Sequence, residues 1–164
     1  MNGITDKLFI HLQLSFQMLT NIIETCPDNL WNIRAENKSI CKRVLHVLES
    51  VDYWLKESGG YFFDSMFNGY SAEMDMENSS LIDKGTMIEY NYIVKQKVNR
   101  FFQSMNDSIL LKNSSIFQNT TYLDIILCQI RHIQINLGYC NEIFNNNGII
   151  CPDWLGYNEE YPAQ

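Results

Sequence analysis

The sequence predicts a single all-α domain over residues 1–164, built as an antiparallel four-helix bundle. Four segments repeat apolar side chains at helical spacing, and no segment of comparable strength alternates apolar and polar residues as a half-buried strand does. Apolar residues make up 46% of the chain and aromatic residues 13%, enough to form a core. A length of 164 residues without an internal repeat suits one domain.

The first predicted helix covers residues 5–25. Its apolar side chains recur every three or four residues, which places them on one face. Pro27 ends it, because proline cannot continue a helix past its first turn. The apolar stripe consists of Leu8, Leu12, Leu19 and Ile22, widened by Phe9, Phe16 and Ile23.

The second predicted helix covers residues 39–57. Ser39 is a favourable N-cap, since its hydroxyl can accept a hydrogen bond from a backbone N–H of the first turn. The pair Gly59-Gly60 is expected to end the helix. Its apolar stripe consists of Ile40, Val44, Leu48, Val51 and Leu55.

The third and fourth predicted helices cover residues 86–105 and 121–145. Thr121 and Asp124 have the spacing of a capping box at the start of the fourth helix, and Gly148 is expected to stop it. The fourth helix is apolar nearly all round, so we expect it to be the most buried of the domain. The third helix has an apolar face made of Met87, Val94, Val98, Phe101, Phe102 and Met105.

A long connection, residues 58–85, joins the second and third helices. Its part 61–80 is rich in Tyr, Phe and Met and then acidic, so it is too apolar for a free linker. We expect it to fold over one end of the bundle and to shape a pocket. In the C-terminal tail, Trp154 is expected to pin the chain to the bundle.

The charge of the chain disfavours several classes of partner. Twelve basic and 19 acidic residues give a formal net charge of −7, which disfavours nucleic acid and anionic membranes as main partners. No apolar run reaches the length of a membrane span, and no signal peptide precedes the first helix, so we expect a cytoplasmic protein. The five cysteines are scattered without a C-x-x-C pair, which favours free thiols over disulfides.

Few residues could carry chemistry, because the common nucleotide-binding, metalloprotease and hydrolase motifs are absent. Cys128, His132 and Asn136 are spaced four apart and therefore share one face of the fourth helix. His46 lies on the second helix, and facing helices of a bundle can each point a metal ligand inward. Alternatively, the histidines are ordinary residues: a helical wheel places His46 opposite the apolar stripe, and His11 lies at the surface or its boundary.

Two segments resemble the DinB/YfiT-like superfamily. The run Ser39-Ile-Cys-Lys-Arg-Val-Leu-His46-Val-Leu-Glu-Ser-Val-Asp52-Tyr-Trp54-Leu is similar to the second helix of that family. The run Gln129-Ile-Arg-His132-Ile-Gln-Ile-Asn136-Leu-Gly138 is similar to its last bundle helix, which typically reads Gln-x-x-His-x-x-x-His-x-Gly. Trp31 and Trp154 also occur where similar proteins have aromatic residues, so the resemblance covers nearly the whole chain.

This resemblance implies a four-helix bundle, often a homodimer, in which three histidines hold a divalent metal such as nickel, zinc or iron. Some members are thiol-dependent S-transferases or hydrolases of small molecules. His46 and His132 match two ligands, whereas Asn136 occupies the position of the third histidine. Three alternatives follow: Asn136 is a ligand, Cys128 or Glu49 replaces it, or the metal site is lost.

Two functions are therefore predicted. In the first, the protein is a metal-dependent transferase or hydrolase, with Glu49 or Asp52 orienting His46 and the segment 61–70 walling the pocket. In the second, it is a non-catalytic binding or stress-response protein in which Asn136 marks a lost metal site. Its pocket then holds a small apolar ligand or nothing, and the Asn136 side chain is hydrogen-bonded to His132. Assembly through a helix face fits either function, and an exposed apolar stripe on the first helix would favour it.

Overall fold

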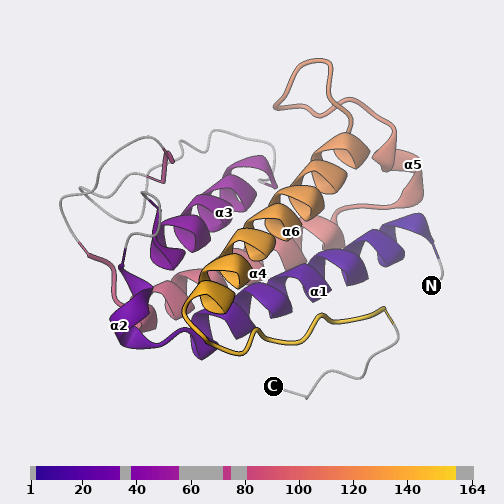
Figure 1. Ribbon diagram of the computed structural model, residues 1–164. Coiled ribbons are helices and arrows are strands. Elements are labelled where there is room, and N and C mark those ends of the chain that lie inside the picture. Colours follow the sequence, from indigo (N-terminus) through magenta and orange to yellow (C-terminus); the bar gives the residue numbers. More distant parts are fainter. Residues whose placement is uncertain (1–2, 34–37, 56–71, 75–80, 158–164) are drawn as a thin grey trace.

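The computed structural model describes residues 3–33, 38–55, 72–74 and 81–157 (Figure 1). These residues form helices and no strand, apart from an isolated antiparallel bridge between Asn113 and Thr121. The predicted all-α class is therefore confirmed. The long helices are α1 (Ile4–Thr25), α3 (Ile40–Trp54), α4 (Lys84–Gln103) and α6 (Tyr122–Asn146), and the short ones are α2 (Asp28–Trp31) and α5 (Asp107–Leu110).

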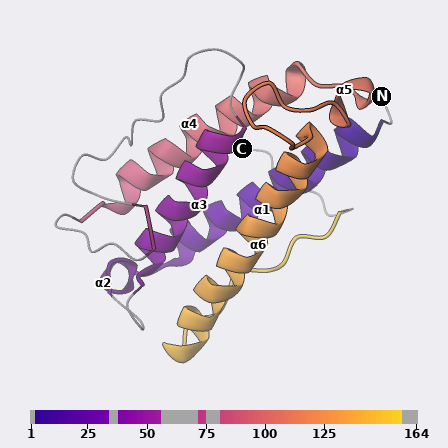
Figure 2. The ribbon, with the colours of Figure 1, turned by 90° about the horizontal axis from the view of Figure 1, so that it is seen from above.

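The four long helices lie side by side around one core (Figures 1 and 2). Helices α1 and α3 each pack against both α4 and α6. The apolar stripes predicted for each helix meet there, and the resulting cluster is continuous. Its largest fully buried side chains are Trp31, Phe16, Phe101 and Phe144.

The helix ends follow local capping chemistry. The Ser39 side chain accepts a hydrogen bond from the Lys42 N–H, and Thr121 and Asp124 form the predicted capping box. Gly148 follows the C-cap residue Asn147 of α6 and has a φ of 69°, in the left-handed region that glycine favours. Helix α4 begins at Lys84, two residues before the predicted start, because Asp83 caps it.

One cap comes from a distant part of the chain. The Asp107 carboxylate accepts hydrogen bonds from the backbone N–H groups of Thr5 and Ile4, at 2.8 and 3.0 Å, and from the Thr5 hydroxyl. The bonds from the Thr5 backbone, the Thr5 hydroxyl and the Ile4 backbone hold the pKa of Asp107 below its ordinary value. The start of α1 is thus tied to α5.

The expectation that the fourth predicted helix is the most buried is wrong. In α3 every apolar residue from Ile40 to Val51 is fully buried. Helix α6 instead leaves Leu127, Ile135 and Tyr139 exposed, with exposed fractions of 42, 57 and 44%. The reason is that burial depends on the neighbouring helices and not only on the apolar side chains of the helix itself. Helix α6 packs on α1, α3 and α5 through only part of its surface, and the rest is exposed.

The tail is anchored differently from the prediction, because Trp154 is 72% exposed. The Cys151 thiol donates instead to the Asn141 carbonyl at 3.4 Å, and Leu155 packs against the core. Tyr157 receives a hydrogen bond from the Lys7 ammonium and stacks at 5.1 Å on the ring of His11. His11 is exposed, as expected.

Other predictions have mixed outcomes. All five cysteines are free, as predicted. Burial raises the pKa of Cys26 to about 11 and that of Cys140 to about 12, so both thiols stay protonated at neutral pH.

The predicted stop at Gly59-Gly60 and the segment 61–70 lie outside the described residues. Among the helices described, none is long and apolar enough to cross a membrane.

Candidate functional site

The structure brings His46 and His132 together where α3 packs on α6. Their ring centroids are 4.7 Å apart, with the ring planes at 89°, so the rings meet edge to face. Both side chains are half-buried. The helical wheel places His46 opposite the main stripe of α3, and it is nevertheless half-buried, because the His132 ring on α6 lies against it.

His46 is oriented by the long connection between α3 and α4. Its Nδ1 lies 3.0 Å from the carbonyl oxygen of Ala72. A carbonyl oxygen can only accept, so Nδ1 carries the proton and Nε2 presents its lone pair. Ala72 and Met74 belong to the predicted connection 58–85, and this described part of it reaches the site, as expected.

Both histidines have a pKa below the ordinary value. For His46 the main cause is burial, opposed by the Ala72 carbonyl and reinforced by the positive charges of Lys42, Lys38 and Arg43. For His132 the main cause is again burial, followed by the neighbouring His46. Within the described part of the chain, no hydrogen bond reaches the ring nitrogens of His132. Both rings are therefore neutral at pH 7 and can offer a nitrogen lone pair.

Asn136 lies one turn after His132 and is buried. Its Nδ2 donates to the backbone carbonyl of His132 at 2.9 Å. The hydrogen bond between these residues thus involves the peptide oxygen and leaves the imidazole free. Asn136 Oδ1 accepts no hydrogen bond from the described residues and remains available as an acceptor or ligand.

The other residues considered from the sequence lie elsewhere. Cys128 is exposed and lines a separate cavity beside Trp54. The Asp52 carboxylate accepts from the Lys97 ammonium at 2.6 Å and from the Tyr90 hydroxyl at 3.2 Å, so it joins α3 to α4 rather than orienting His46. Glu49 is buried and acts electrostatically on Lys42. Among the described residues, no three His, Cys, Asp or Glu side chains are grouped as a metal site would require.

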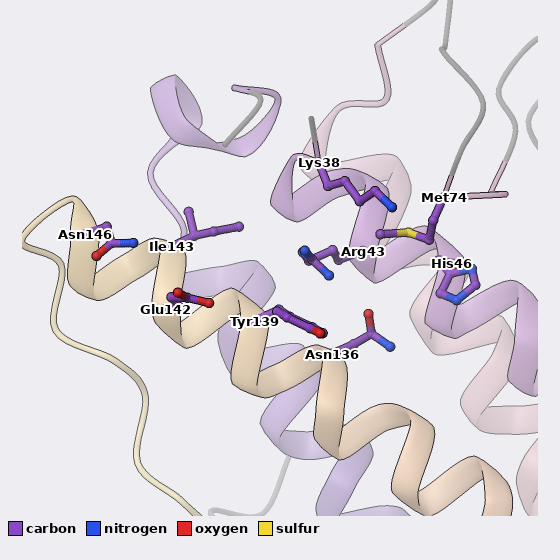
Figure 3. A pocket seen from close by; sticks show the side chains of 9 residues that line it. All are labelled: Lys38, Arg43, His46, Met74, Asn136, Tyr139, Glu142, Ile143 and Asn146. Carbon is purple, nitrogen blue, oxygen red and sulfur yellow. The ribbon is translucent and has the colours of Figure 1, made fainter. Parts of the chain in front are cut away.

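A cavity of about 460 Å³ opens beside His46 and Asn136, between α3 and α6 (Figure 3). Arg43 and Tyr139 line it from opposite helices, and the guanidinium carbon of Arg43 lies 4.2 Å from the Tyr139 ring centroid. Sequence reasoning overlooked both residues. The available signal was their spacing, since Arg43 precedes His46 by three positions and Tyr139 follows Asn136 by three, on the same helix faces.

The chain matches no protein-family model, and it shows no significant similarity to a curated protein or to a solved structure. The geometry of the His46–His132 site therefore carries the functional argument.

The lowered histidine pKa values predict how stability depends on pH in metal-free protein. As the pH falls below about 6.5, the ordinary pKa of histidine, unfolded chains take up protons that the folded site resists. The free energy of unfolding should therefore fall between pH 7 and pH 5, and His132→Gln should make this fall shallower. Urea unfolding with EDTA, followed by circular dichroism at several pH values, measures the slope. An unchanged slope in His132→Gln would contradict the assignment.

Proposed function

We propose that this protein is a DinB-like antiparallel four-helix bundle that binds one divalent metal through His46 and His132 and catalyses transfer to, or hydrolysis of, a small molecule. The observation that carries the proposal is the meeting of two neutral imidazoles from α3 and α6, with ring centroids 4.7 Å apart, beside a cavity of about 460 Å³. Cavities of this size suit small molecules.

The donors suit a borderline transition metal. Imidazole nitrogens are common ligands of zinc, nickel and iron, and the Ala72 carbonyl orients His46 as outer-shell partners orient ligating histidines. Asn136 Oδ1 offers a third, weaker donor beside the cavity. The centroid separation of 4.7 Å is short enough for two imidazoles that share one ion.

A bound ion would lower the pKa of a water or thiol and so supply a nucleophile at neutral pH. The residues of the chain have other tasks. Packing of α3 on α6 excludes water from one side of the histidines, and the Ala72 carbonyl fixes the His46 tautomer. Asn136 can accept a hydrogen bond from a bound substrate through Oδ1.

A non-catalytic ligand-binding protein is the second candidate. It is favoured by the lack, in the described ranges, of a third His, Cys, Asp or Glu beside the two imidazoles. Under this alternative the cavity retains a ligand while no metal is held. A homodimer fits both candidates, and the exposed Ile88, Tyr92 and Ile93 on α4 offer it a better surface than α1, whose apolar stripe is mostly buried.

Elemental analysis of the untagged protein by plasma mass spectrometry tests the metal. We expect about one metal ion per chain, lost in His46→Ala and in His132→Ala, because each variant removes one of two strong donors. His11→Ala is the matched control, since it removes the remaining histidine of the sequence from an exposed position. Metal that persists in both site variants, or none after incubation with nickel or zinc, would overturn the metal site and leave the second candidate.

A further inference from the structure

The wall of the same cavity carries an arginine that nothing in the described structure neutralises. The Nε of Arg43 is buried and has no hydrogen-bond partner. Buried donors are normally satisfied, and a donor on a charged group is expensive to leave unpaired. Glu142 lines the cavity as well, yet it forms no ion pair with Arg43 in the described part of the chain. Because Nε is closed off from solvent while the Arg43 side chain lines the cavity, a ligand acceptor would bind the guanidinium through its terminal nitrogens.

The guanidinium is held in place by the opposite helix. Its central carbon lies 4.2 Å from the ring centroid of Tyr139, a cation–π contact that fixes the plane of the side chain. Figure 3 shows Arg43 reaching from α3 toward α6, between Tyr139 and Lys38. A fixed planar fork that faces a cavity suits recognition of a carboxylate or phosphate group, which it can bind with two parallel hydrogen bonds.

The charged residues that line the cavity also favour an anionic ligand. The whole chain carries a formal net charge of −7, but Lys38 and Arg43 both line this cavity. Together with Lys42, they act on His46 as positive charges. Glu142 is the third charged residue of the lining, which therefore carries one more positive than negative charge. Positive potential in a cleft of an acidic protein attracts small anions and focuses them there.

We propose that this cavity binds a small organic anion, held by the Arg43 guanidinium through a carboxylate or phosphate group. A volume of about 460 Å³ restricts the ligand to a small molecule. The amides of Asn136 and Asn146 also line the cavity and can hydrogen-bond the rest of the ligand. If the bound anion is the substrate, the inference rests on the proposed function. Binding of the anion itself requires no metal.

Isothermal titration of the full-length, EDTA-treated protein tests the inference, with malonate and inorganic phosphate as probes. Malonamide, the uncharged counterpart of malonate, controls for shape. We expect saturable binding of at least one anion, weakened by about ten- to hundredfold in Arg43→Gln, because charge-assisted hydrogen bonds are lost. Arg100→Gln, an exposed arginine on α4, removes the same charge and should bind as the wild type does. Tighter malonate binding would identify a carboxylate ligand, and tighter phosphate binding a phosphorylated one.

Equal binding by Arg43→Gln and wild type, or no binding of either anion by the wild type, would overturn the inference. If Arg43→Gln does not fold, Tyr139→Leu replaces it, because losing the ring frees the guanidinium and should also weaken binding. The same titration on His132→Ala separates the two proposals. Anion binding retained there, in a variant without metal, supports the anion site whatever the outcome for the metal.

Discussion

Replacing Lys97 by Met should lower the free energy of unfolding by about 3 kcal/mol, because it leaves a buried carboxylate without its cation. The Asp52 side chain is 6% exposed, and its Oδ1 lies 2.6 Å from the Lys97 ammonium. The Tyr90 hydroxyl remains at 3.2 Å and can donate a single hydrogen bond, which does not neutralise the charge. Met keeps much of the apolar stem of Lys97, so the loss reports the charge rather than packing.

Urea unfolding followed by circular dichroism measures the effect of Lys97→Met. Lys95→Met is the matched control on the same helix, and it should change the free energy of unfolding by no more than about 0.5 kcal/mol. Adding Asp52→Asn to Lys97→Met should restore part of the loss, since the double variant buries no unpaired charge. If Lys97→Met and Lys95→Met unfold alike, the ion pair between α3 and α4 does not contribute to stability.

Replacing Trp31 by Ala should lower the free energy of unfolding by about 3–5 kcal/mol, the range for truncating a buried large aromatic residue. Trp31 is 2% exposed and belongs to the core cluster. Its Nε1 donates to the Ile82 carbonyl at 2.8 Å, which joins α2 to the residues that precede α4. Truncation therefore removes both apolar packing and a buried hydrogen bond.

Trp31→Phe separates these two contributions, because it keeps a large ring and removes the indole N–H. It should lose about 1 kcal/mol, the usual net contribution of one hydrogen bond, because the Ile82 carbonyl still accepts from the Asn32 amide at 3.4 Å. Trp154→Ala is the matched control; its 72% exposure predicts a change within about 0.5 kcal/mol. Equal losses in Trp31→Ala and Trp154→Ala would contradict the assigned packing of α2.

The helices could be predicted from the sequence because their signals are local. Apolar spacing within α1, α3, α4 and α6 places side chains on one face whatever surrounds the helix. The Ser39 cap and the Thr121–Asp124 capping box join residues three apart, so they too could be seen in the sequence. The cap that Asp107 provides for α1 could not, since it joins residues separated by 102 positions.

Part of the candidate site could likewise be predicted from the sequence, and part could not. The spacing of His132 and Asn136 on one helix face, and the presence of His46 on another helix, were visible in the sequence. The sequence could not show that α6 covers His46, that the Ala72 carbonyl selects its tautomer, or that Arg43 lies over Tyr139. Each of these contacts joins elements far apart in the chain, and no local pattern encodes them.

The sequence by itself determined the all-α class and the approximate bounds of the four long helices, and it supplied the candidate metal ligands. Only the tertiary structure decided their neighbours: His46 meets His132 and lines one cavity with Asn136, whereas Asp52 pairs with Lys97 and Tyr90. It also decided that Trp31 is buried and Trp154 exposed. The physical reason is that spacing fixes the face of a helix on which a side chain lies, whereas burial and pairing depend on the helix that covers that face.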